Sequence, residues 1–170
     1  VAKWFDARMQ EHNEQLRRVC RYLKAWRDHH WRNGGGPTSV LIMIIVARNF
    51  QPALRRDDMA LEQAARHLAR ELAQDVYERG IDEGKENFNR LSPLDRQLAS
   101  ERATALAQQL YTSRHYGAGL KQAAVDNVRA QLGSRIANDA DLVQVDASAE
   151  VRSTPAATVV PPIVHATKAG

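Results

Sequence analysis

Apolar residues recur every three or four positions along most of the first 132 residues, which is the spacing of one face of an α-helix. The clearest stripe lies within residues 11–32 and consists of Leu16, Val19, Cys20, Leu23 and Trp26. A turn signal follows at 33–37, where glycines tolerate a left-handed C-cap and Pro37 cannot continue a helix. We therefore predict a long amphipathic first helix that ends near residue 32.

Two further helices are expected before residue 79. Thr38 or Ser39 opens the second, from Val40 to about Phe50, and its residues are apolar on nearly every side. A helix with this pattern belongs at the centre of a domain. Asp57 or Asp58 is expected to cap the third, which we expect to run to about Glu78 and to be followed by a polar loop at 79–91.

The C-terminal half carries clear helix boundary signals. Ser92-Pro93-Leu94-Asp95 resembles a capping box with proline at the first helical position, which predicts a fourth helix to about His115. A fifth helix is expected at about 118–132, with Gly133 as its stop. We find no alternating strand pattern and no internal repeat, and therefore predict an all-α bundle of about five helices.

Composition changes after about residue 142. The last twenty residues contain three prolines, few charges and no periodicity. We therefore divide the chain into a helical lobe at 1–142 and a flexible, disordered C-terminal tail at 143–170.

The overall composition favours a soluble globular protein. The chain has 170 residues, 44% hydrophobic and 26% charged, which allows one domain with a buried core. We see neither an apolar run as long as a membrane span nor a signal peptide. A single cysteine excludes an internal disulfide and fits a reducing compartment, so we expect a cytoplasmic protein with no membrane partner. The chain starts at Val1 without methionine, and we expect it to be part of a longer polypeptide.

The positive charge is concentrated near the N-terminus. The formal net charge is +4, and residues 1–32 hold eight lysines and arginines against four acidic residues, whereas the rest of the chain holds sixteen of each. This distribution indicates a local anionic ligand on the first helix rather than a surface coated for nucleic acid.

Several catalytic and metal-binding patterns are excluded. The six histidines do not stand at zinc-ligand spacings, and the glycines at 34–36 lack the Gly-Lys-Ser/Thr of a P-loop. Gly133-Ser134 followed by Asp139-Ala140-Asp141 mimics a nucleotidyl-transfer signature, but the gap is too short for the helix that must separate the two parts. We interpret this segment as a surface turn, and assign no catalytic or metal-binding residue.

One pair of features predicts an anion site. Arg21 and Lys24 lie on one face of the first helix, and Thr38 and Ser39 begin the second. Hydroxyls and free N–H groups at a helix N-terminus bind phosphate well, and a lysine beside them adds charge. We therefore expect these four residues to hold a triphosphate.

At these residues the sequence resembles the bacterial cGAS/DncV-like nucleotidyltransferases (CD-NTases), which share an outline with poly(A) polymerases and oligoadenylate synthetases. The resemblance spans about residues 3–142. It rests on Trp4-Phe5, the string LRRVCRYLKAWRD at 16–28, the Pro37-Thr38-Ser39 start and Leu132-Gly133-Ser134-Arg135-Ile136.

The resemblance implies the second, helical lobe of an enzyme that joins nucleoside triphosphates, such as ATP and GTP, into cyclic oligonucleotides for antiphage signalling. It implies that Lys24 contacts the donor triphosphate, with Ser39, or Thr38 if the register slips, assisting. The family's catalytic carboxylates and the Mg²⁺ that they bind belong to an N-terminal lobe that is missing here. We therefore expect this chain alone to be inactive. Ala137 replaces a proline that is frequent in the family.

The C-terminus carries a further implication of the resemblance. Some of these enzymes are linked through their last residue to other molecules by a partner resembling ubiquitin-conjugating enzymes, and a flexible tail ending at Gly170 suits that chemistry. An ordinary frayed terminus is the other reading. The competing functions for the whole chain are a basic helical module that binds nucleic acid, which we rank lower, and a protein-interaction scaffold.

Overall fold

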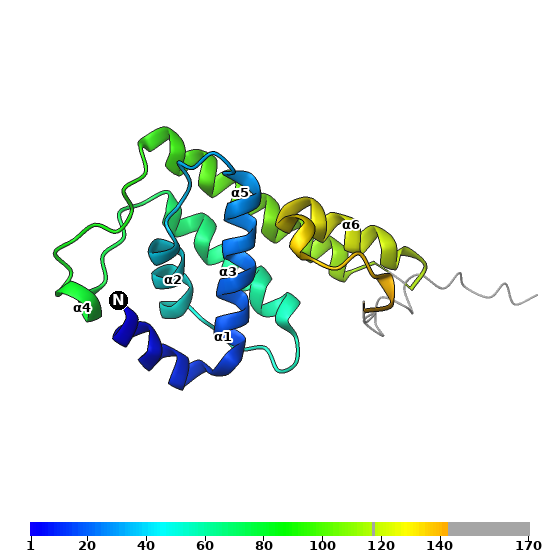
Figure 1. Ribbon diagram of the computed structural model, residues 1–170, viewed down its shortest axis with the longest axis horizontal. Coiled ribbons are helices and arrows are strands. Elements are labelled where there is room, and N and C mark those ends of the chain that lie inside the picture. Colours follow the sequence, from blue (N-terminus) through cyan, green and yellow to red (C-terminus); the bar gives the residue numbers. More distant parts are fainter. Residues whose placement is uncertain (117, 143–170) are drawn as a thin grey trace, which may run out of the picture.

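The computed structural model describes residues 1–116 and 118–142, and every regular element within them is a helix (Figure 1). The elements are α1 (Ala2–His30), α2 (Ser39–Arg48), α3 (Asp57–Leu72), α4 (Arg79–Asp82), α5 (Pro93–Arg114) and α6 (Lys121–Leu132), with short 3₁₀ turns η1 (Ala118–Leu120), η2 (Gly133–Arg135) and η3 (Ala140–Leu142). The all-α prediction is confirmed. The predicted disordered tail at 143–170 lies outside the described residues.

The core is built around α2, as its apolar sequence predicts. Six of the ten residues of α2 are buried: Leu41, Ile42, Ile44, Ile45, Val46 and Ala47. Helices α1, α3 and α5 add their apolar faces to the same cluster, including the fully buried Trp26 and Leu68. Burial of each large apolar side chain contributes about 1.5–3 kcal/mol relative to exposure, so this cluster stabilises the fold.

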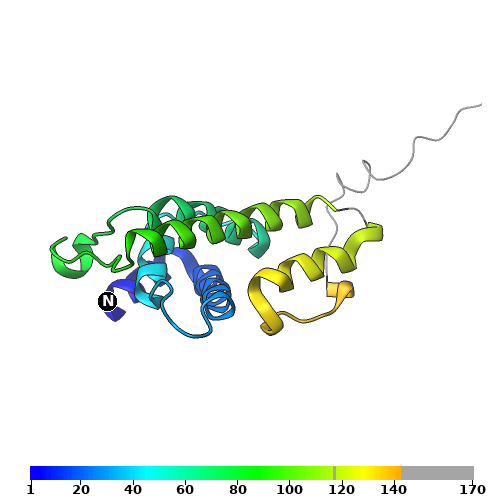
Figure 2. The same cartoon turned by 90° about the horizontal axis from the view of Figure 1, so that it is seen from above.

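Helices α3 and α5 meet through small side chains and lie side by side in both views (Figures 1 and 2). The buried alanines are Ala60, Ala64, Ala65 and Ala69 on α3 and Ala99, Ala103 and Ala107 on α5. Ser100 Oγ also donates a hydrogen bond to the backbone oxygen of Ala69 at 2.7 Å. Small residues let two helix backbones approach closely, so this contact fixes α5 as the platform on which α6 packs.

The predicted caps of α5, α2 and α6 are confirmed, whereas the predicted cap of α3 by Asp57 or Asp58 is wrong, because Arg56 is the N-cap and both aspartates lie in the first turn. Ser92 Oγ accepts a hydrogen bond from the backbone N–H of Asp95 at 3.2 Å, and Pro93 occupies the first turn. Thr38 Oγ1 accepts from Leu41 N at 3.1 Å and so caps α2. Gly133 ends α6 with a φ of +78°, a left-handed conformation that glycine adopts without strain.

The first helix begins earlier than predicted, at Ala2 instead of about residue 11. Its N-terminal part lies near α4 (Figure 1), where a Cβ on Gly80 would stand 2.5 Å from the Trp4 ring. Trp4 and Phe5 pack against the core. Tertiary contacts of these rings, not a periodic stripe, explain why this segment is helical.

The predicted end of α3 at Glu78 is wrong, because the helix stops at Leu72. Asn89 Nδ2 donates to the backbone oxygens of Leu72 (2.9 Å) and Gln74 (2.7 Å), which satisfies carbonyls that a continuing helix would have used. Val76 is still buried, with its N–H bonded to Asn87 Oδ1 at 3.0 Å. The interpretation of 79–91 as loop is wrong for the single turn of α4 and holds elsewhere in that segment.

None of the helices among the described residues combines the length and the apolar character needed to cross a membrane.

Candidate functional site

The end of α1 and the start of α2 are held together by a short glycine-rich connection. Gly34 and Gly35 have φ values of +86° and +88°, in the left-handed region that favours glycine. At Gly36 a Cβ would lie 2.6 Å from the Trp31 ring, so no larger residue fits without a shift. The connection returns the chain so that the first turn of α2 lies against the last turn of α1.

Ser39 is joined directly to α1 by Arg27. Arg27 Nη1 donates a hydrogen bond to Ser39 Oγ at 2.6 Å, and both residues are half-buried. Arg27 Nε also donates to Asp28 Oδ1 at 2.9 Å. The hydrogen bond from Arg27 is the main cause that lowers the pKa of Asp28, with Arg135 assisting. Asp28 therefore stays ionised and holds the guanidinium of Arg27 toward α2.

The N-terminus of α2 keeps free donors beside this contact. Thr38 caps the helix, and its backbone oxygen accepts from Ile42 N at 3.1 Å. Within the described part of the chain, the N–H groups of Ser39 and Val40 form no hydrogen bond. Free N–H groups in the first turn of a helix, together with the positive end of its dipole, form a good environment for an anion.

Lys24 lies three residues from both Arg21 and Arg27 on α1, so it is a neighbour of each on the helix surface. Lys24 is half-buried and Arg21 is exposed, and neither forms a hydrogen bond or ion pair with the residues that the structure describes. Burial raises the pKa of the neighbouring Cys20 thiol to about 12, and the charge of Lys24 opposes that increase. The convergence of Lys24 and Arg21 on Ser39 remains a prediction.

Arg27 is the residue that sequence reasoning missed. It stands in the same string, three positions after Lys24, and that spacing was the available signal. The sequence does not show how tightly the glycine connection folds back, and it therefore does not indicate that Arg27 reaches Ser39.

The last turn of α1 is anchored to α5. Arg102 Nη1 donates to the backbone oxygen of His30 at 2.8 Å, and its guanidinium stacks over the Trp31 ring with 4.6 Å to the centroid. Burial lowers the pKa of His30, and the charge of Arg102 lowers it further. These contacts fix the orientation of the helix end that presents Arg27 to Ser39.

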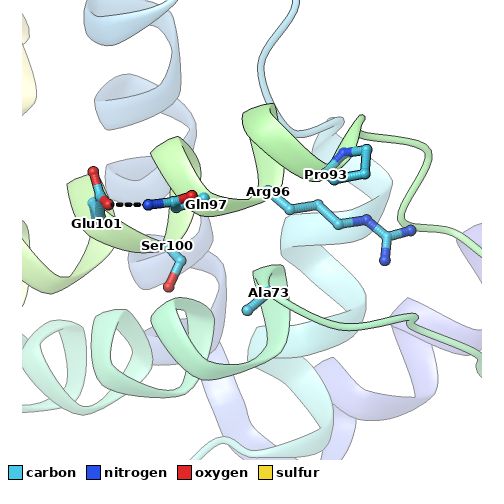
Figure 3. A pocket seen from close by; sticks show the side chains of 6 residues that line it. All are labelled: Ala73, Pro93, Arg96, Gln97, Ser100 and Glu101. Carbon is cyan, nitrogen blue, oxygen red and sulfur yellow. Dashed lines mark hydrogen bonds between the residues drawn. The ribbon is translucent and has the colours of Figure 1, made fainter.

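A hollow of about 300 Å³ lies at the start of α5 (Figure 3), and we do not assign a functional site to it. Its polar side chains are used in structural contacts: Gln97 Nε2 donates to Glu101 Oε1 at 2.9 Å, and Arg96 Nη1 lies 2.8 Å from Asp75 Oδ1. Arg96 also donates to the backbone oxygens of Asn89 (2.8 Å) and Leu91 (3.1 Å). These bonds hold the segment before α5 in place.

The segment after α6 is a surface turn, as predicted. Gly133–Arg135 and Ala140–Leu142 are 3₁₀ turns, and Asp139 Oδ1 accepts from the backbone N–H of Asp141 at 2.9 Å. Among residues 1–116 and 118–142, no group of three or more His, Cys, Asp or Glu side chains is arranged to hold a metal ion. Gly170, the predicted conjugation residue, lies outside the described residues.

This arrangement of helices occurs in known proteins. The cyclic GMP-AMP synthase of Vibrio cholerae serotype O1 is 32% identical over 82 residues, which are 48% of this chain and 18% of that protein. The structure of Vibrio cholerae DncV cyclic AMP-GMP synthase with the linear intermediate 5′ pppA(3′,5′)pG superimposes with a TM-score of 0.73 at 22% identity, covering 85% of this chain and 38% of that chain. Escherichia coli DncV in its 3′-deoxy GTP bound form gives a TM-score of 0.72 at 22% identity, covering 85% and 40%.

The fold and the sequence string on α1 thus define the C-terminal lobe of a cGAS/DncV-like nucleotidyltransferase. The family described as "Cyclic GMP-AMP synthase, C-terminal domain" matches residues 13–145, and the chain belongs to this family. The aligned residues make up 18% of the Vibrio cholerae relative and 38% of the solved Vibrio cholerae chain, so this chain corresponds to less than half of either protein.

Proposed function

We propose that this chain is the lobe of a cyclic oligonucleotide synthase that binds a nucleoside triphosphate. The hydrogen bond between Arg27 and Ser39 at the open end of α2 carries this proposal. It places a guanidinium, a hydroxyl and two free backbone N–H groups within the first turn of one helix. Family membership supports the enzyme class, and ATP or GTP is the ligand that we expect.

Each group has a defined task in this proposal. Ser39 Oγ accepts from Arg27, which leaves the hydrogen of the hydroxyl free to be donated to a phosphate oxygen. The N–H groups of Ser39 and Val40 donate to the same phosphate, and Arg27 and Lys24 neutralise its charge. Arg21, one turn earlier on α1, extends the cationic path toward the distal phosphates.

The chemical step belongs outside this chain. Among the described residues, no group of three or more His, Cys, Asp or Glu side chains could hold a metal ion. We propose that the catalytic carboxylates, with their Mg²⁺, lie in a separate lobe of the complete protein, which acts in the cytoplasm in antiphage signalling. In that arrangement the residues on α1 and α2 bind and orient the triphosphate and do not take part in bond making. The attachment of Gly170 by a ubiquitin-conjugation-like partner is part of the same proposal.

Titration of the 170-residue chain with ATP and GTP, followed by NMR chemical shifts, tests the binding proposal. We expect the largest shifts at the amides of Ser39 and Val40. Lys24→Ala and Ser39→Ala should each weaken binding roughly tenfold or more, the effect of losing one hydrogen bond to a charged group. Lys3→Ala is the matched control, because Lys3 is exposed at the N-terminus of α1, far along the helix from Arg27.

The proposal is overturned if Lys24→Ala and Ser39→Ala bind ATP and GTP as the unchanged chain does. Single-stranded DNA serves as a second ligand for the alternative, a nucleic-acid-binding module, since Arg21, Lys24 and Arg27 form a basic row on α1. Tight, steeply salt-dependent binding of DNA without binding of triphosphate would favour that alternative.

A further inference from the structure

A larger cavity lies on another side of the molecule, between α1, the start of α3, the end of α5, and α6 with the segment that follows it. Its volume is about 530 Å³, which is within the range of roughly 300–1,000 Å³ typical of small-molecule sites. Arg21, Lys24, Thr38 and Ser39 are not among its lining residues. The cavity is therefore separate from the triphosphate site proposed above.

One wall of the cavity is apolar and aromatic. Leu110 of α5 and Val125 and Val128 of α6 form the apolar part. Tyr22 of α1 and Tyr116 after α5 add two rings, and the hydroxyl of Tyr116 accepts a hydrogen bond from Asn127 Nδ2 at 3.1 Å. Such a wall favours the apolar body of a ligand, with the rings available for stacking.

A buried hydroxyl without a partner also lines this cavity. Ser113 is 9% exposed, and its Oγ forms no hydrogen bond among the described residues. Arg114 Nε is buried without a partner as well, although Arg114 Nη2 donates to Glu62 Oε2 at 2.7 Å. Buried polar atoms are nearly always hydrogen-bonded, and each exception calls for an explanation. A ligand with a polar atom at this depth would provide the missing partner for Ser113.

Five cations and three carboxylates line the cavity, so positive charge is in excess; the carboxylates are Asp57, Asp58 and Asp139. Arg55 and Lys121 form no ion pair or hydrogen bond with residues that the structure describes. Arg55 has a φ of +56°, a left-handed conformation that is uncommon for a residue other than glycine. The other lining cations have partners: Arg56 pairs with Asp58, Arg114 with Glu62 and Arg135 with Asp28.

We propose that this cavity binds a small amphipathic anion, with an apolar ring system against the Leu110–Val125 wall and a carboxylate or phosphate directed to Arg55 and Lys121. The hydroxyl of Ser113 hydrogen-bonds to a polar atom of the ring system. The apolar wall supplies affinity, and the two free cations select for negative charge. The site is formed by this chain alone and does not depend on the proposed triphosphate site.

Three aromatic probes of matched size test the proposal: 1-naphthoate, 1-naphthyl phosphate and neutral 1-naphthol. Titrations of the 170-residue chain followed by NMR should show shifts at Ser113, Lys121 and Val125. We expect the anions to bind at least fivefold more tightly than 1-naphthol, and the tighter of the two anions identifies the preferred acidic group. Arg55→Ala combined with Lys121→Ala should weaken binding of the anions roughly tenfold, since charge-assisted hydrogen bonds are lost, and leave 1-naphthol unaffected.

Matched variants separate this site from others. Ala137→Trp places a large ring at an exposed position on the cavity rim and should abolish binding, whereas Ala130→Trp, exposed on α6 but not lining the cavity, should not. Lys24→Ala should leave binding of 1-naphthoate unchanged, so failure of the triphosphate proposal and failure of this one are distinguishable. Equal affinity for 1-naphthol and the anions, or shifts that persist in Ala137→Trp, would overturn the proposal.

Discussion

Arg135 Nη1 lies 2.9 Å from Asp28 Oδ2, and this contact joins the turn after α6 to α1 across 107 positions of the chain. The other oxygen of the same carboxylate accepts from Arg27, which in turn donates to Ser39. Asp28 therefore lies between two arginines and links α1 and the start of α2 to a turn more than a hundred positions later in the chain. One of these arginines lines the large cavity and the other reaches the start of α2.

The position of Asp28 predicts a specific dependence of stability on acid. Its pKa in the folded chain is lower than its ordinary value, first because of the hydrogen bond from Arg27. Since an aspartate in an unfolded chain has a pKa of about 3.9, Asp28 stabilises the fold above that pH, and its contribution disappears as the pH falls through the lower folded value. Thermal unfolding of Asp28→Asn should depend less steeply on pH below about 4 than that of the unchanged chain.

Asp126→Asn, exposed on α6, is the control for this experiment. Asp57 and Asp58 also have lowered pKa values. Both variants keep these two residues, so each will retain part of the acid sensitivity of the unchanged chain. A pH profile of Asp28→Asn identical to that of Asp126→Asn would contradict the prediction.

Glu62 is a buried carboxylate held between two helices. It is 6% exposed and accepts from Arg66 of α3 at 2.8 Å and from Arg114 of α5 at 2.7 Å. Glu62→Ala would leave the guanidinium of Arg114 without its partner, and we expect a loss of roughly 3 kcal/mol in the free energy of unfolding. Urea denaturation followed by circular dichroism measures it. Glu101→Ala, exposed on α5, should change the free energy by less than about 0.5 kcal/mol.

Gly133 and Gly34 allow the effect of backbone conformation to be distinguished from the effect of close packing. Both have positive φ values, but a Cβ would meet the His29 ring at 2.9 Å only at Gly133, whereas Gly34 has open space. Gly34→Ala should therefore destabilise the fold by about 1 kcal/mol from backbone strain alone, and Gly133→Ala by roughly 2 kcal/mol. Gly119→Ala, with open space and no positive φ, should have little effect. Equal melting temperatures for the first two variants would show that His29 moves aside freely.

The rate at which the Cys20 thiol is labelled reports how often the core opens. It is 3% exposed, and burial raises the pKa of its thiol to about 12. Because the thiolate is the reactive form, a disulfide reagent at pH 7 should modify the folded chain only when the core opens. Labelling should be at least a hundredfold slower in the folded chain than in urea, as followed by mass spectrometry. Rapid labelling without denaturant would mean that α1 detaches readily from α2.

The helices and their caps could be predicted because the signals that produce them are local. The stripe ending at Trp26, the cap at Ser92 and the stop at Gly133 each depend on residues within one or two turns. The end of α3 depends on Asn89, seventeen positions beyond the helix end, and no local pattern indicates it. Helix formation at Ala2 similarly depends on the Trp4 contact with Gly80.

Less of the site than of the fold could be predicted. The spacing along α1 and the hydroxyls at Thr38 and Ser39 predicted a site at these two helix ends, and that site stays a prediction. The direct contact of Arg27 with Ser39 depends on how the connection at 31–38 folds back, which glycine leaves undetermined in sequence. The large cavity depends on α6 packing across α5 and α1, and its unpaired residues, Arg55 and Lys121, are 66 positions apart in the printed sequence.

The alanine contact between α3 and α5 restricts how this lobe can evolve. Seven alanines on the two helices are buried, and a larger side chain at any of them would overpack the core, so selection for a new specificity has little freedom there. We expect more variation at the helix ends and in the connections, where both proposed ligand sites lie. Homologues with different ligands should accordingly keep the small residues of this contact and diverge around it.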